Sequence, residues 1–312
     1  RASIISKTVL TKSHATVLEF VLDHGASFSF EPGQWANICL PSLSRFEFHP
    51  FAIIASTTGE GEEEEEEQTK GRNVMILCKV LGDWTAKLEK APLSVIAEKG
   101  ALIQGPIGRI PFVIESFKTV VIIGAGCAIS PALGIAQRMF MLMRKGKNVV
   151  DGDEGDETVQ SSRKPLLSDE EGTSTSSTTT TKKKKRKERN PQRVVVILTV
   201  VFRDMFAPFS KFISAFSSEP RFRVECFESG PPRALYDPKA HVPTAEEVAM
   251  VPIPVTIGMP KIDDLFAEIK RENKSKFGDV AVVAAGPPPL QKAVIRACQK
   301  NSFTLHLESN AW

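Results

Sequence analysis

The sequence lacks the patterns that hold metal ions or build a disulfide framework. Its five cysteines are widely separated and include no CxxC pair, so neither a zinc site nor a dithiol redox centre is expected. Its five histidines show no HExxH motif and no paired spacing, so we expect no metal bound by protein side chains. Several cysteines lie in apolar, strand-like runs, where a free thiol is a small hydrophobic group, and this favours a reducing, cytosolic compartment.

Long apolar runs and an excess of charge are missing as well. The longest nearly apolar run, residues 194–202, has nine residues including one Thr, whereas a membrane helix needs about 18. No charged-then-apolar leader opens the chain, and residue 1 is Arg, so we expect a piece of a longer protein whose other segments could span a membrane. The net charge is 40 − 37 = +3, which is too small to indicate a nucleic-acid partner.

Two low-complexity stretches interrupt a chain that is otherwise long enough, at 312 residues, for two domains. Residues 59–71 include six consecutive glutamates, which repel one another and must be solvated. Residues 147–192 run from acidic through Ser/Thr-rich to basic with almost no apolar side chains, so we expect a disordered insertion. Its basic run, 182–189, is either simply solvated, or a contact for anionic lipid or a targeting signal.

The remaining sequence changes its pattern once. Residues 1–116 contain short strands and turns with one short helix at about 85–91, which predicts an antiparallel β-barrel. In residues 117–312, Val- and Ile-rich strands alternate with helices, which predicts a doubly wound parallel α/β sheet covered on both faces. Ligands of such sheets bind beyond the carboxyl ends of the strands. The predicted strands of this half are 119–123, 194–202, 221–227, 280–285 and 303–307, and its predicted helices are 131–144, 208–216, 262–271 and 289–299.

A glycine-rich turn follows the first strand of the second half. It reads Gly124-Ala-Gly126-Cys-Ala-Ile129-Ser130-Pro131, in which the glycines allow a tight turn, Ser130 suits a helix cap and Pro131 suits the first helical turn. A phosphate can bind at the N-terminus of the helix that follows. Because Ile129 stands at the third glycine position of the Rossmann GxGxxG motif, a plain strand-to-helix connection remains the alternative.

Two other strand ends carry candidate residues. Gly286-Pro287 follows strand 280–285 and is either a rigid turn or part of the same ligand edge. Arg203 follows strand 194–202. Its charge is either an ordinary surface charge or is placed to contact the ribose or 2′-phosphate of a dinucleotide.

The first half carries three further motifs. Residues 45–51 are rich in aromatics and include Phe48-His49-Pro50-Phe51. Gly82-Asp83-Trp84-Thr85 opens the one helix predicted for this half, which makes it another potential phosphate site. Gly105-Pro106-Ile107-Gly108 closes the predicted barrel, and the chain ends in Trp312.

Taken in order, these motifs resemble the ferredoxin–NADP reductase superfamily, and within it the cytosolic dehydrogenase module of membrane NADPH oxidases and ferric-chelate reductases. The resemblance covers the chain apart from the two low-complexity stretches. It implies an FAD-binding β-barrel over 1–116 and an NAD(P)-binding α/β domain over 117–312. By this resemblance, FAD contacts His49, Pro50, Phe51, Ala52, Gly82, Asp83, Trp84, Thr85 and Trp312, the last covering the flavin until nicotinamide displaces it. NADPH contacts Gly108, Gly124, Gly126, Ser130, Pro131, Arg203, Gly286 and Pro287.

The sequence departs from this family pattern at three places. Ala52 stands where a Thr can hydrogen-bond flavin N5, and Ala285 stands where a Cys is common beside the nicotinamide. No residue is therefore assigned a catalytic role, although hydride transfer can persist because the cofactors perform the chemistry and the protein positions them. Gly258-Met259-Pro260 replaces a Gly-Arg-Pro, which weakens the case for NADPH over NADH.

The resemblance thus implies an oxidoreductase at the cytosolic face of a membrane. Hydride would pass from NADPH to FAD, and single electrons would pass to haem in a transmembrane portion of the same parent chain, with a ferric chelate or dioxygen as terminal acceptor. One alternative is a soluble flavin or ferredoxin-type reductase. A second is a regulatory nucleotide-binding module with little turnover, which Ala52 and Ala285 favour. A third, an α/β protein whose turns are only structural, is disfavoured because six motifs occur in family order.

Overall fold

The computed structural model of the chain describes residues 1–22, 30–31, 33–55, 73–108, 114–148, 191–231, 243–273 and 279–308. The expectations for the acidic stretch 59–71, for residues 149–190 of the insertion and for Trp312 lie outside these residues.

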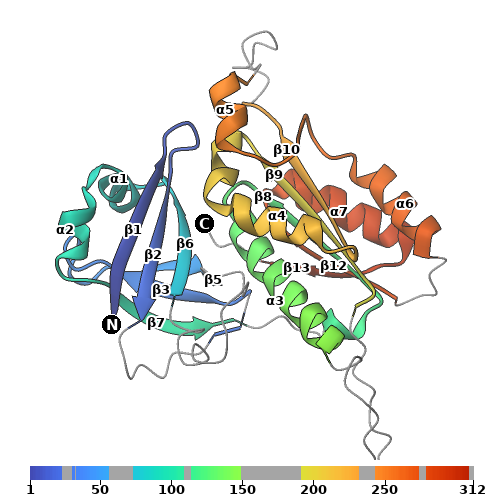
Figure 1. The fold of residues 1–312 in the computed structure, drawn as a ribbon, viewed down its shortest axis with the longest axis horizontal. Helices are drawn as coiled ribbons and strands as arrows, with labels where there is room; N and C mark the ends of the chain where they lie inside the picture. The colour runs from blue at the N-terminus through green and yellow to red at the C-terminus, as the bar shows by residue number, and fades with distance from the viewer. Residues whose placement is uncertain are drawn as a thin grey trace, which may run out of the picture.

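The first half forms two antiparallel sheets that pack against each other as a barrel, with strand orders β1-β2-β6-β5 and β4-β3-β7 (Figure 1). Alternate side chains of each strand face a common core, as Leu18 and Phe20 do from one sheet and Ile38 from the other. The predicted antiparallel fold is therefore confirmed. The strands are β1 (Ala2–Leu10), β2 (Ala15–Leu22), β3 (Trp35–Cys39), β4 (His49–Ala52), β5 (Ile54–Ala55), β6 (Asn73–Lys79) and β7 (Leu102–Ile107).

The described part of this half has two helices, where the sequence predicted one. Helix α1 (Asp83–Lys90) is the predicted one, and α2 (Leu93–Ala97) follows it after Pro92. Ile96 of α2 is buried in the barrel core. The prediction was wrong about α2 because five residues are too few to show a helical period.

The second half is a six-stranded parallel sheet with the order β11-β10-β9-β8-β12-β13. The order reverses direction between β8 and β12, which makes that point the expected ligand crevice. The doubly wound fold predicted from the sequence is confirmed. Its strands are β8 (Thr119–Ala125), β9 (Arg193–Val200), β10 (Phe222–Glu228), β11 (Val255–Ile257), β12 (Val280–Ala285) and β13 (Thr304–Leu307), and its helices are α3 (Ile129–Asn148), α4 (Ser210–Ser218), α5 (Ala245–Met250), α6 (Ile262–Asn273) and α7 (Pro288–Asn301).

Both faces of this sheet are covered, which explains its unbroken apolar strands. In β8, Val120 and Ile122 belong to one core with α3 and α4, whereas Val121 and Ile123 belong to another with α6 and α7. Figure 1 shows the two helix pairs on opposite sides of the sheet. A strand buried on both faces needs no polar alternation, so the sequence pattern reports the layered architecture directly.

Three local predictions for this half were wrong. Helix α3 begins at Ile129 after a 3₁₀ turn, Gly126–Ala128, so Ser130 lies inside the helix and does not cap it. The region between the predicted strand 221–227 and the predicted helix 262–271, for which the sequence predicted no element, contains α5 and β11. The predicted helix 208–216 starts later as α4, because the 3₁₀ helix η4 (Arg203–Phe209) precedes it and contains Pro208, which lacks a backbone N–H.

The barrel and the parallel sheet share one apolar core. Strand β2 is buried on both faces: Leu18 points into the barrel, whereas Ala15 and Val17 pack with residues of α3 and η4. At the other end of this interface, the buried amide of Gln137 on α3 pairs with the backbone of Ala55, donating to its O (2.9 Å) and accepting from its N (3.2 Å). The two halves are thus joined by apolar packing and by directed hydrogen bonds.

One helical segment of the described residues, Gly126–Arg144, is long and apolar enough to cross a membrane by length and composition. In the structure, 72% of its apolar window is buried in the protein interior. Its apolar character is accounted for by packing between the sheet and the barrel.

The packing of α3 on β8 generates a stability prediction. A Cβ at Gly124 would lie 2.7 Å from Ala132 Cβ and 2.8 Å from Ala128 O, so Gly124→Ala must push the helix from the strand. We expect an unfolding free energy lower by about 1–3 kcal/mol, the usual cost of overpacking. Gly82→Ala is the matched control, because a Cβ there meets nothing within 4 Å, and should cost less than about 1 kcal/mol. Equal losses in urea unfolding of the two variants would contradict this account.

Candidate functional site

On the barrel, strand β4 and the start of helix α1 bring two separate sequence motifs together. The rings of His49 and Trp84 have centroids 4.4 Å apart, and those of Phe51 and Trp84 are 6.1 Å apart and stacked. Successive strand residues point to opposite faces, so His49 and Phe51 share the face toward Trp84. Phe51 is only 6% exposed, because its ring is packed in the barrel core.

The opposite face of β4 presents Pro50 and Ala52. Pro50 is exposed and pairs in register with Asn37, whereas Ala52 pairs with Trp35. Gly108, which the sequence assigned to NADPH, lies on the barrel beside this pair: a Cβ there would be 2.9 Å from Trp35 Nε1. Its φ of 92° and this close approach both require glycine.

Two buried polar atoms in this cluster, His49 Nε2 and Trp84 Nε1, have no hydrogen-bond partner within the described structure. Unpaired buried polar groups are costly and usually mark a missing partner. A group with several acceptor oxygens, such as the pyrophosphate of FAD, fits beside them. The start of α1 fits too, because the first N–H groups of a helix have no partner within it, and because Gly82 is open on its side-chain face.

Thr85 and Asp83 occupy the same helix start. The Thr85 hydroxyl accepts from the backbone N–H of Leu81 and Gly82 and donates to Gly82 O, so it caps its own helix. Asp83 is an exposed acidic residue in the first turn. A phosphate would therefore be bound here by backbone N–H groups and the helix dipole rather than by the threonine hydroxyl.

In the α/β half, the ends of β8 and β12 form adjacent turns at one edge of the sheet. Gly124 and Gly286 serve close packing: a Cβ at Gly286 would meet Leu290 Cδ2 at 2.9 Å and Ala125 Cβ at 3.0 Å. Gly126, in contrast, has a φ of 63° and open space on its side-chain face. Of the glycines proposed for this turn, Gly126 is the one that leaves room for a ligand.

The N-terminal turn of α3 is mostly covered. Ser130 and Pro131 are buried, and Ser130 Oγ has no hydrogen-bond partner within the described structure. The partly exposed residues of this turn are Gly126 and Cys127, a residue that sequence reasoning did not assign to the site. Burial raises the pKa of the Cys127 thiol, with nearby Lys79 acting in the opposite direction. This thiol therefore remains protonated near neutral pH.

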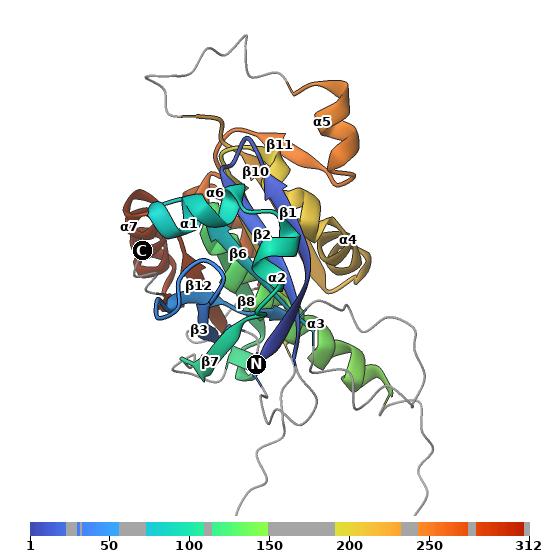
Figure 2. The same cartoon turned by 90° about the vertical axis from the view of Figure 1, so that its left-hand side faces the viewer.

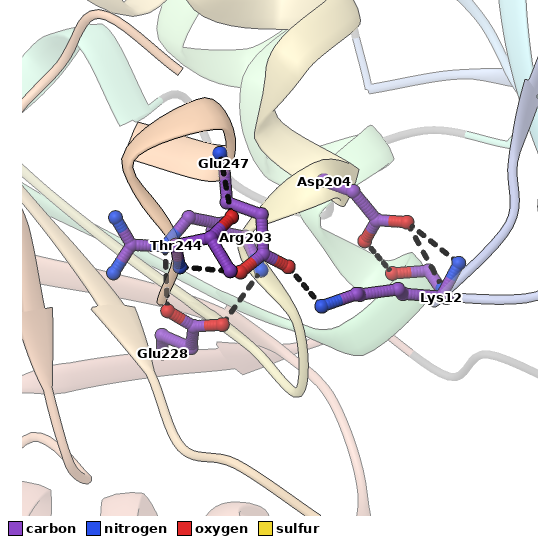
Figure 3. A network of polar contacts seen from close by, with 7 residues as sticks. Lys12, Arg203, Asp204, Glu228, Thr244 and Glu247 are labelled. Carbon is purple, nitrogen blue, oxygen red and sulfur yellow. Dashed lines mark hydrogen bonds and ion pairs between the residues drawn. The ribbon is translucent and has the colours of Figure 1, made fainter. Parts of the chain in front are cut away.

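Arg203 lies at the carboxyl edge of the sheet, but it is not a solitary charge. Its Nε donates to Glu228 Oε2 (2.7 Å) and its backbone N–H to Glu228 Oε1 (3.1 Å), and both residues are buried (Figure 3). Glu228 ends β10, the strand next to β9, and so arrives at the same edge. The sequence analysis missed Glu228, although its place at the end of a predicted strand was a signal. In Figure 3 the terminal nitrogens of Arg203 extend away from this carboxylate.

The remaining candidates surround these turns. Ala285 is the buried last residue of β12, directly before Gly286, and Pro287 is the exposed residue that precedes α7. Met259 is 60% exposed, next to Gly258, whose N–H donates to Glu228 O. The structure thus brings together the ends of β8, β9, β10 and β12, while Trp312 lies outside the described residues.

The FAD-binding domain family matches residues 4–111 of the chain. NADPH oxidase 1 of Mus musculus is 25% identical over 151 residues, covering 46% of this chain and 22% of that protein. Ferric reduction oxidase 5 of Arabidopsis thaliana is 21% identical over 140 residues, covering 45% of this chain and 18% of that protein. The chain thus spans about a fifth of the length of these relatives.

Solved structures show the same fold across both halves. The ferredoxin NADP+ reductase of Neisseria gonorrhoeae with bound FAD and NADP superposes with a TM-score of 0.58 at 12% identity, covering 98% of this chain and 96% of that one. The CS-b5R domains of human Ncb5or give a TM-score of 0.58 at 15% identity, covering 99% of this chain and 68% of that one. These matches show that both halves of the chain have the fold of ferredoxin–NADP reductases, that its barrel matches an FAD-binding domain, and that nearly half of the chain is similar to NADPH oxidases and ferric reductases.

Proposed function

We propose that this chain passes a hydride from NADPH to FAD, and that it then passes single electrons onward to a haem. The observation that carries the proposal is the position of helix α3. It starts at the open Gly126 turn of the α/β half and contacts strands β4 and β5 of the barrel. The edge that would bind dinucleotide and the strand that would bind flavin are therefore attached to one rigid element.

On the flavin side, the residues supply positioning. His49 Nε2 and Trp84 Nε1 are buried atoms that can donate to the FAD pyrophosphate, and the start of α1 at Gly82 adds backbone N–H groups. Pro50 and Ala52 form the outer face of β4. FAD, when bound, accepts the two electrons of a hydride together and releases them one at a time.

On the dinucleotide side, the turn at Gly126 and the N-terminus of α3 can hold the NADPH pyrophosphate. Arg203 would contact the 2′-phosphate with its terminal nitrogens, because Glu228 already engages its Nε. Gly286 allows the β12 turn to lie against Ala125, and Ala285, the residue before it, would then lie on the nicotinamide side. Neither Ala52 nor Ala285 can exchange a proton, so the protein would act here by orientation and by excluding water.

The parent protein would place this module at the cytosolic face of a membrane. The sequence relatives are NADPH oxidases and ferric reductases, and the chain covers only part of them. A haem-bearing transmembrane portion of the same parent chain would accept the electrons, with a ferric chelate or dioxygen as the terminal acceptor. The second candidate function, a regulatory module that binds nucleotide without turnover, is favoured by the alanines at positions 52 and 285.

Flavin reduction distinguishes these two functions. We expect the purified chain to bind FAD at one equivalent, and the oxidised-flavin absorbance to bleach promptly on anaerobic stopped-flow mixing with NADPH. A spectrum that stays unchanged while both coenzymes bind would contradict the oxidoreductase and support the regulatory module.

The flavin side is tested by His49→Ala. Losing a hydrogen bond to a charged phosphate costs about 1.5–3 kcal/mol, so FAD affinity should fall roughly 10- to 100-fold. His14→Asn is the matched control, because His14 is an exposed histidine with a φ of 45° that asparagine tolerates. Equal FAD affinities of the two variants in a fluorescence titration would contradict the assignment.

The dinucleotide side is tested by Arg203→Ala, measured by steady-state kinetics with each coenzyme. The Michaelis constant for NADPH should rise roughly 10- to 100-fold, which is the effect expected from losing a hydrogen bond to a charged group. The Michaelis constant for NADH should rise much less. Because this change removes the guanidinium of the buried Arg203–Glu228 ion pair, the double variant Arg203→Met/Glu228→Gln, which removes both charges, should show the same preference. Arg223→Ala is the control, since Arg223 lies near the opposite end of β10 and pairs with Glu268. Equal effects on NADPH and NADH would remove Arg203 from the phosphate-binding role.

A further inference from the structure

The tip of the β1–β2 hairpin, a part of the barrel, is held by one carboxylate of the α/β half. Asp204 Oδ2 accepts from the backbone N–H of Lys12 (3.0 Å) and of Ser13 (3.1 Å), and Asp204 Oδ1 accepts from Ser13 Oγ (Figure 3). A carboxylate with three donors is nearly saturated, and hydrogen bonds to a charged group are stronger than neutral ones. This contact therefore fixes the direction in which the hairpin meets the sheet domain.

A second polar link reaches the same tip from helix α5. Lys12 Nζ contacts Glu247, which is itself held at the start of α5 because its carboxylate accepts from the backbone N–H of Thr244 (2.8 Å). The Lys12 ammonium is the main cause that lowers the pKa of Glu247 below its usual range. The Lys12 contact consequently stabilises the folded chain at neutral pH and is lost as the pH falls through that lowered pKa.

Apolar packing supports the hairpin behind this polar contact. Leu10 and Ala15, on either side of the tip, are buried in the same core as Met205 and Phe206 of η4. The residue after Asp204 is thus anchored in the sheet domain, and hairpin and η4 meet through both apolar and polar contacts. Figure 1 shows the hairpin reaching toward α5, away from the contact of β5 with α3.

The residue before Asp204 is the candidate 2′-phosphate ligand. Arg203 points toward Glu228 and the dinucleotide edge, whereas Asp204 points toward the barrel (Figure 3). Both belong to η4, whose core residues are buried. The same short helix therefore carries a dinucleotide contact on one side and an interdomain contact on the other.

We propose that Asp204 is a positioning residue for hydride transfer, and this proposal rests on the proposed function. Asp204 holds the barrel in the orientation that brings the flavin against the nicotinamide. Together with the Gln137–Ala55 pair it ties the interface at two separated points, which restricts tilting and rotation of the barrel on the sheet domain. Asp204 touches neither coenzyme.

Orientation matters here because hydride transfer tolerates little displacement. Reacting atoms must approach to about 3–3.5 Å, and a misplacement of about 1 Å can cost roughly 100-fold in rate. Apolar packing alone is non-directional, so loss of the three hydrogen bonds at Asp204 permits such a displacement without unfolding the interface. Each coenzyme would still bind, but the nicotinamide and the flavin would no longer be held at the distance that hydride transfer needs.

The proposal is tested with Asp204→Ala in the FAD-loaded chain, by anaerobic stopped-flow reduction with NADPH. We expect the limiting rate of flavin reduction to fall about 10- to 100-fold, and the long-wavelength charge-transfer band of stacked nicotinamide and flavin to weaken. The dissociation constants of FAD and of 2′-phospho-AMP should stay within about twofold of wild type. Asp204→Asn, which keeps one acceptor oxygen, should give an intermediate rate. Asp263→Ala is the matched control, because Asp263 forms an exposed ion pair with Arg296 on α7.

The possible outcomes separate the two proposals. If wild type reduces flavin and Asp204→Ala does so at the same rate with the same charge-transfer band, the positioning role is wrong. If the rate and the thermal stability fall while both dissociation constants rise, the contact is merely structural and the role is again wrong. If wild type binds both coenzymes without reducing flavin, the proposed function itself fails, and the positioning role fails with it.

Discussion

Everything in this structure depends on the shared apolar core between the barrel and the parallel sheet. Strand β2 contributes to two cores at once, with Leu18 facing the barrel and Val17 facing α3 and η4. Each buried side chain of this kind contributes about 1.5–3 kcal/mol, so apolar packing holds the halves together. It does not set their relative orientation, to which the hydrogen bonds at Asp204 and Gln137 contribute.

The packing between the two halves links both candidate coenzyme sites through helix α3. Helix α3 connects them, since it begins at the Gly126 turn and lies against β4 further along. Figure 1 and Figure 2 show α1 on the outer side of the barrel. Because no polar side chain stands at Ala52 or Ala285, the account assigns the protein a geometric role: binding two coenzymes in register and keeping water from them.

Sequence reasoning identified the layers because they leave strong local signals. The Val- and Ile-rich strands needed both faces covered, and strand 280–285 was placed to the residue. Sequence reasoning failed for features that depend on tertiary packing and leave no local pattern. Helix α2 is too short to show periodicity, and the covered position of Ser130 depends on packing that no local pattern reveals. The pairing of Arg203 with Glu228 joins residues 25 apart and becomes visible only when β9 and β10 lie side by side. The contact between Asp204 and Ser13 becomes visible only when the barrel packs against the second half.

The most direct test of the account is a crystal structure of the chain with FAD and NADP+ both bound. The account expects the flavin against β4 and the start of α1, with its pyrophosphate beside His49 and Trp84. It expects the dinucleotide at the Gly126 turn, its adenosine phosphate near Arg203, and the nicotinamide stacked against the flavin. Density for either coenzyme away from these elements, or protein lying between the nicotinamide and flavin rings, would contradict the account.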